Sequence, residues 1–244
     1  GAEPAIDAVV GEWRLRFPDL TGSAAEYLAA GEEQMARDTT QGYAAAEEAY
    51  QKALVLDPRN DRAIAGWALA LAFGHHGEVD DRTGGAAEAM LSASELRSGD
   101  PRVYVAHAHL QLARKGNFND VQALAERGRS SASDKDKALA NLALGQAYLT
   151  RNQKFAADYF GQAATLDPKL KRALLYQAQL LVQQGELKRA MESVEKRLTA
   201  DPDQWEAADM LARLYVEAGE FARARKTYEL VRSNTGRDAR VTLT

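Results

Sequence analysis

The sequence contains no cysteine among its 244 residues, and it has no apolar run close to the length of a membrane span, about 20 residues. Disulfides, zinc sites with cysteine ligands and thiol catalysis are therefore excluded, and both the cytosol and the periplasm suit the chain. The net charge is −4, with acidic and basic residues spread along the chain rather than gathered in a basic block. This distribution disfavours nucleic-acid binding.

Aromatic residues are also scarce, at 7% of the chain, whereas hydrophobic residues make up 45% and charged residues 27%. These proportions are typical of a folded protein rather than a disordered one. Alanine, the strongest helix former, is the commonest apolar residue. We therefore expect helices that pack closely through small side chains.

Proline is rare, and four of the six prolines follow an aspartate, at Pro58, Pro101, Pro168 and Pro202. The last two are 34 residues apart, whereas Pro58 and Pro101 are 43 apart, so that interval carries an insertion of about nine residues. The residue before a proline avoids the helical region, and proline suits the first position of a helix. Each Asp-Pro pair is thus expected to end one helix and to begin the next.

Between these prolines the apolar residues have helical spacing. The first helix of each interval shows a large residue, then a large residue followed by a small one, then another large residue, as in Ile64, Trp67-Ala68 and Leu71. The second helix shows a small, a large and a small residue, as in Ala156, Phe160 and Ala163. Glycines predicted to end the first helix in a left-handed conformation are Gly116, Gly185 and Gly219.

This pattern resembles the tetratricopeptide repeat family over residues 23–236, as about six units. The resemblance implies an all-α fold, a right-handed superhelical solenoid of antiparallel helix pairs. Residues 1–22 form an N-terminal extension, read either as a helix that caps the first repeat or as one that docks in a groove. Residues 237–244 form a tail or begin a further helix, and we expect the natural chain to continue beyond Thr244.

Chemistry-bearing residues are few. His75-His76 and the acidic residues that follow could supply ligands for a metal-dependent enzyme, but a solvated polar loop is the expected reading. No set of residues with the spacing of a catalytic triad or a phosphate loop is present, so we expect no enzyme, no cofactor and no metal. Trp13, Trp67 and Trp205 are expected in the core or in the cap.

The family resemblance also implies a binding site, because in such solenoids the first helix of each unit lines a concave channel that holds the partner. Leu175, Gln179, Asp209 and Arg213 stand where family members that grip a C-terminal carboxylate carry Lys and Asn, so that clamp is absent. The predicted partner-binding residues are His107, Leu110, Arg114, Leu139, Leu142, Gln146, Arg172, Leu175, Tyr176, Gln179, Gln183 and Arg213.

The sequence therefore predicts a scaffold or adaptor that binds a protein or peptide, with an amphipathic helix as one candidate, and neither nucleic acid nor a direct membrane span. We expect a bacterial module of a larger complex that organises motility, polarity or signalling. The alternative is an envelope assembly factor resembling the pilotins of type IV pili. The native N-terminus separates the two, because a lipid-anchored factor needs a leader followed by cysteine.

Overall fold

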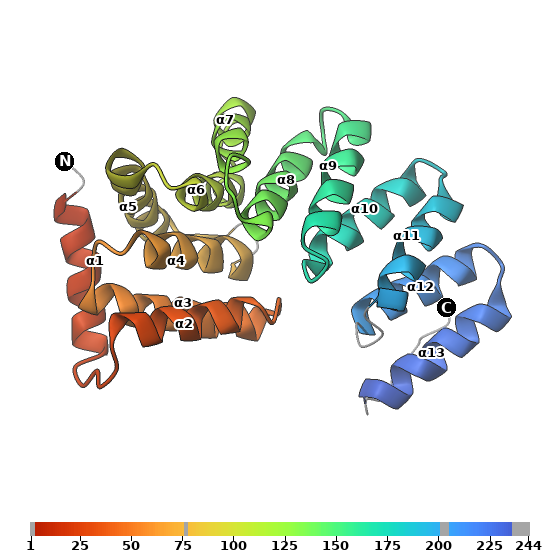
Figure 1. Cartoon of the computed structure of the whole chain (residues 1–244), viewed down its shortest axis with the longest axis horizontal. Helices are drawn as coiled ribbons and strands as arrows, with labels where there is room; N and C mark the ends of the chain where they lie inside the picture. Colours follow the sequence, from red (N-terminus) through yellow and green to blue (C-terminus); the bar gives the residue numbers. More distant parts are fainter. Residues whose placement is uncertain (1–2, 76–77, 201–204, 236–244) are drawn as a thin grey trace. The chain divides into compact units, whose positions relative to one another are not determined.

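The computed structural model describes residues 3–75, 78–200 and 205–235, and in these ranges it consists of 13 α-helices without a β-strand (Figure 1). The predicted all-α class is confirmed. None of these helices combines the length and the apolar character needed to cross a bilayer. The helices are α1 Glu3–Arg16, α2 Ala24–Met35, α3 Thr40–Leu56, α4 Asp61–Gly74, α5 Asp81–Ser98, α6 Pro101–Ala113, α7 Phe118–Gly128, α8 Asp134–Tyr148, α9 Gln153–Leu166, α10 Lys171–Gln183, α11 Leu187–Ala200, α12 Trp205–Glu217 and α13 Phe221–Thr235.

The chain divides into two compact units, and each is described by itself. Unit 1 comprises residues 1–151 with α1 to α8, and unit 2 comprises residues 152–244 with α9 to α13. Within each unit, consecutive helices pack as pairs, such as α2 with α3, α6 with α7, and α12 with α13. The predicted number of repeats stays a prediction, because α8 and α9 belong to different units.

The Asp-Pro pairs end helices as predicted, but only one of those described begins a helix. Pro101 is the first residue of α6, and the Asp100 side chain accepts a hydrogen bond from the Arg102 amide in the first turn of that helix. After Pro58, by contrast, the chain makes a short turn, and α4 is capped by Asn60 instead. The prediction was therefore wrong at Pro58, because an asparagine two residues later offers the first-turn amide a side-chain acceptor. It was also wrong at Pro168, where a turn follows the proline and α10 begins only at Lys171. The Asp201-Pro202 pair lies outside the described residues.

Two helices in unit 1 are buried on all sides along much of their length. In α4 every residue from 63 to 71 is buried, and in α6 every residue from 103 to 110. Their contacts explain this, because α4 packs against α2, α3, α5 and α6, and α6 packs against α4, α5, α7 and α8. A helix that is apolar or small on every face suits such a central place.

A buried tyrosine packs between α2, α3 and α4 of unit 1. The Tyr50 ring, from α3, is fully buried and lies against Gly31 of α2 and Gly66 of α4, where an added Cβ would overlap it. Its hydroxyl has no hydrogen-bond partner among the described residues, and burial raises its pKa above the ordinary value. The two glycines thus make room for an aromatic ring between three helices.

We expect Gly66→Ala to lower the stability of unit 1 by about 1–3 kcal/mol, because the new methyl group would overpack the contact with the Tyr50 ring. Thermal unfolding followed by circular dichroism measures this. Gly11→Ala in α1 is the matched control, since a Cβ there meets nothing within 4 Å and alanine favours the helix. Equal melting temperatures for the two variants would contradict the packing described.

The core of unit 2 is smaller and is formed by apolar residues of α10, α11, α12 and α13. Ala178 and Val194 of this core, and Ala212 of α12, are completely buried. The buried cluster consists of Leu174, Ala178, Leu181, Ala190, Met191, Val194, Ala207, Leu211, Leu214, Tyr215 and Ala224. The complete burial of Ala178 and Ala212 agrees with the expectation that the helices pack closely through small side chains.

Candidate protein-interaction surface

The predicted binding residues on α6 do not face an open channel. His107 Nδ1 contacts the carboxylate of Glu95 on α5, and the Arg114 guanidinium lies 3.9 Å from both Asp81 and Glu88. Leu110 is completely buried. These three side chains are held by packing within unit 1, so they do not offer a partner the surface that the sequence predicted.

The predicted residues on α8 are divided between core and surface. Leu142 is completely buried, whereas Leu139 and Gln146 are half-buried. The Leu139 carbonyl accepts a hydrogen bond from His109 Nε2 at 2.9 Å, which ties α8 to α6. Leu142 therefore stabilises unit 1 and is removed from the candidate surface.

On α10 the predicted residues do reach the surface. Gln179 and Gln183 are exposed, and Arg172, Leu175 and Tyr176 are half-buried. Their spacing places all five on one side of the helix. We call these five residues the α10 surface. Its centre is apolar and its ends are polar.

Tyr176 is positioned by the preceding helix. Its ring stacks on Phe160 of α9, with 5.0 Å between ring centroids and 17° between ring planes. Phe160 is completely buried, so it provides a fixed support for the tyrosine. An aromatic side chain held in this way loses little conformational entropy when a partner binds.

Arg213, the predicted residue on α12, takes part in a separate cluster. Its guanidinium pairs with Asp209 of the same helix at 2.8 Å and remains largely exposed. Both groups influence Tyr228 of α13, whose pKa is raised by burial first and then by the Asp209 carboxylate. Arg213 thus points toward α13, and we leave it outside the α10 surface.

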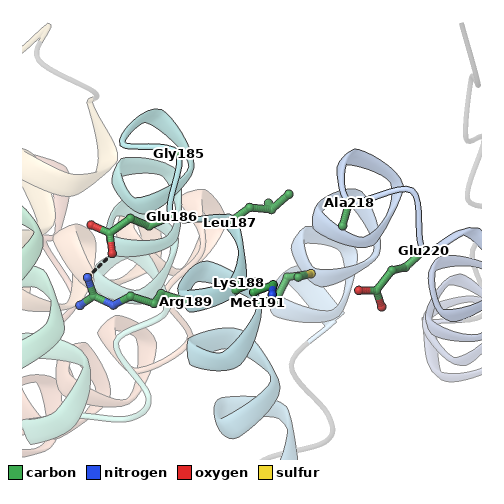
Figure 2. Close-up of a pocket in the computed structure, with 8 residues that line it drawn as sticks. All are labelled: Gly185, Glu186, Leu187, Lys188, Arg189, Met191, Ala218 and Glu220. Atoms are coloured by element: carbon green, nitrogen blue, oxygen red, sulfur yellow. Dashed lines mark hydrogen bonds and ion pairs between the residues drawn. The ribbon is translucent and has the colours of Figure 1, made fainter.

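Unit 2 also contains a pocket that the sequence did not reveal (Figure 2). It lies between the turn that joins α10 to α11 and the turn that joins α12 to α13, and its volume is about 490 Å³. Leu187, Met191 and Ala218 supply apolar lining, while Lys188 and Glu220 supply charge. The sequence carries a signal for it, because Gly-Glu followed by a large apolar residue occurs at both turns.

An ionic cluster stabilises the second of these turns. Arg223 pairs with Glu220 and with Glu195 of α11, each at 2.7 Å, and lies over the Tyr215 ring. The Tyr215 hydroxyl donates a hydrogen bond to Glu195 at 2.6 Å. Burial and this bond raise the pKa of Tyr215 to about 12, so the phenol stays neutral and keeps donating at physiological pH.

No metal centre is evident in the part of the chain that the structure describes, where no three His, Asp or Glu side chains gather to hold an ion. His75 Nε2 lies 3.2 Å from Glu47 of α3, so this histidine contacts a neighbouring helix. His76 lies outside the described residues. The described side chains around His75 therefore do not provide the ligand set that a metal-dependent enzyme at this loop requires.

Comparison with known proteins confirms the resemblance. A tetratricopeptide repeat model matches residues 181–243, and a search of curated protein sequences finds no relative. The helical-repeat fold is shared with solved structures over most of the chain. At the low sequence identities involved, between 14% and 16%, these similarities establish the fold and nothing about partner or activity.

Three of these structures are informative about length. A thermophilic tetratricopeptide protein of Thermus thermophilus shares 16% identity at a TM-score of 0.63, over 80% of this chain and 100% of that one. PilF of Pseudomonas aeruginosa shares 15% sequence identity at a TM-score of 0.57, over 87% of this chain and 92% of that one. A monomeric IFIT1 mutant with m7Gppp-AAAA shares 14% sequence identity at a TM-score of 0.63, over 93% of this chain and 54% of that one. The chain thus spans about half of IFIT1.

Proposed function

We propose that this chain is a non-catalytic adaptor that binds a segment of a partner protein on the α10 surface. The observation that carries the proposal is the accessibility of one equivalent position in the first helices, the one that follows Ala68 in α4, His109 in α6 and Ala178 in α10. That residue is Leu110 in α6 and is completely buried, but it is Gln179 in α10 and is exposed. α10 therefore retains an accessible face at the position where α6 carries a buried leucine.

The chemistry of the α10 surface fits an amphipathic helix. Leu175 and Tyr176 offer apolar contact area, and Tyr adds a polar tip, which is the composition common at binding hot spots. Gln179 and Gln183 are one helical turn apart and provide donors and acceptors at the edge. A partner helix with an apolar stripe and polar flanks would match this arrangement.

The pocket beyond α10 supports the same function. It begins at Gly185, two residues after Gln183, and its apolar lining suits one large side chain of a bound segment. A volume of about 490 Å³ is within the range of small ligand sites, roughly 300–1,000 Å³. An anchoring leucine or phenylalanine next to the helix-binding face would add specificity.

The cellular setting belongs to the same proposal. We place the adaptor in a bacterial complex for motility, polarity or signalling, with an envelope assembly role like that of a pilotin as the alternative. The similarity to PilF over 92% of that chain makes the alternative worth testing, although 15% identity reaches only the fold. Protein rather than RNA is the proposed partner, because the net charge is −4 without a basic block.

We expect Tyr176→Ala combined with Gln179→Glu to weaken partner binding by about 2 kcal/mol or more, which is roughly 30-fold, because an aromatic anchor and its polar neighbour are lost together. The measurement has two stages. Partners are first captured from native extract by the wild-type chain and identified by mass spectrometry. The affinity of one purified partner is then measured against each variant by calorimetry.

Two controls accompany this experiment. Lys226→Glu reverses an exposed charge on α13, away from α10, and should bind normally. Tyr176→Phe keeps the ring that stacks on Phe160, and so separates lost packing from lost binding. The proposal fails if the α10 variant binds its partner like the wild type while Lys226→Glu does not.

A further inference from the structure

The N-terminal helix α1 does not extend the repeat array but packs on unit 1 at a site between α3 and α5, which we call the seat. α1 packs against both α3 and α5, which are the second helices of two successive pairs. Val9, Val10 and Trp13 are buried there, and the Trp13 ring meets the edge of Trp67 from α4 with 4.7 Å between centroids. The helix thus fills a place between α3 and α5 that reaches down to α4.

The ion pairs around this seat lie at the surface. Glu12 pairs with Arg82 in the first turn of α5, and both side chains are more than half exposed. One helical turn later, at the end of α1, Arg16 lies 3.3 Å from the Gln51 amide oxygen and 3.8 Å from Glu48. Exposed ion pairs contribute little to affinity and mainly fix orientation. Three apolar side chains therefore supply most of the attachment of α1.

The connection to the rest of the chain is long enough to let α1 leave its seat. Residues 17–23 join α1 to α2 and include Pro18 and Gly22. Seven extended residues reach about 23–25 Å. The 14 residues of α1 are about 21 Å long. The N-cap of α2 at Ser23 is closed by its own capping box with Glu26, so α2 does not depend on α1 to begin.

We propose that the seat between α3 and α5 is a helix-binding site that exchanges its occupant, so that α1 of one copy of this chain binds the seat of a second copy. A second copy is the occupant with guaranteed complementarity, because it brings the same three apolar residues and the same Glu12 for Arg82. Exchange of an identical element is a low-cost route to a dimer. It involves unit 1 alone and does not depend on the α10 surface.

The absence of cysteine from the whole chain allows a direct test. Glu12→Cys is introduced into one preparation and Arg82→Cys into another, both in the full chain. The two are mixed at high concentration and treated with a short bis-maleimide, because an ion pair can exceed the roughly 6 Å Cα spacing that a disulfide needs. Exchange predicts a covalent heterodimer on denaturing gels, with a yield that rises when the protein concentration is raised.

Two controls decide the result. The double variant Glu12→Cys with Arg82→Cys should cross-link within one chain, seen by intact mass, and so report that α1 is seated. Arg14→Cys mixed with Arg82→Cys should give no heterodimer, because Arg14 lies about 200° around α1 from Glu12. The proposal is overturned by a double variant that cross-links only internally with no heterodimer from the single variants, by a double variant that does not cross-link, or by equal yields from Arg14→Cys and Glu12→Cys.

Discussion

Trp67→Ala is expected to lower the stability of unit 1 by about 3–5 kcal/mol, the range for removing a buried aromatic side chain. Trp67 is completely buried in α4 and also receives the Trp13 ring of α1. Its loss would leave a cavity below the N-terminal helix and weaken the attachment of that helix. Chemical denaturation followed by far-ultraviolet circular dichroism measures the effect without depending on tryptophan fluorescence.

Trp67→Phe is the matched control for this variant. It keeps an aromatic ring in the same place and removes the indole Nε1, which is buried and has no hydrogen-bond partner within the described ranges. Removing an unsatisfied buried donor offsets part of the stability lost with the smaller ring. Trp67→Phe should therefore lower the free energy of unfolding clearly less than Trp67→Ala does. If Ala and Phe shift the denaturation midpoint equally, the cavity is not the cause and the packing around Trp67 is misassigned.

Leu142→Glu is expected to destabilise unit 1 by about 3–5 kcal/mol, because it places an unpaired carboxylate in the core. The family resemblance implied that Leu142 lies on a partner-binding face, where a charge would affect binding and leave the fold intact. The complete burial of this side chain reverses that expectation. Urea denaturation of the variant, compared with the wild type, distinguishes the two.

Gln146→Glu provides the comparison on the same helix. Gln146 lies one turn after Leu142 and is half-buried, so a carboxylate there keeps contact with water. Its effect on the denaturation midpoint should be small. A Leu142→Glu chain as stable as Gln146→Glu would show that α8 is rotated from the orientation described.

Much of the fold could be predicted because helical spacing and turn glycines act locally. Gly185 and Gly219 end α10 and α12 with φ of 76° and 75°, in the left-handed conformation that glycine tolerates best. In the equivalent turn after α6 the left-handed residue is Lys115, with φ of 58°, and not the predicted Gly116. The prediction identified the right turn, but the left-handed backbone is adopted one residue earlier, by Lys115 instead of Gly116.

The site was harder to predict because exposure depends on neighbouring helices. His107 and Tyr176 occupy equivalent positions, two residues before His109 in α6 and Ala178 in α10, and each contacts the second helix of the preceding pair. The prediction treated them as free channel residues, which is wrong for His107. The more useful signal is the residue that follows Ala68, His109, Gly145, Ala178 and Ala212. It is leucine in α4 and α6 and glutamine or arginine in α8, α10 and α12.

That change of residue type has an evolutionary consequence. Leu69 and Leu110 are enclosed by surrounding helices, so a substitution at either position must be matched by changes in several neighbours. Gln179 and Arg213 are less constrained, because both are exposed and Arg213 forms its ion pair with Asp209 of its own helix. Descendants of this protein that acquire new partners should therefore diverge first at these positions of α10 and α12, while α4 and α6 change slowly and keep their leucines.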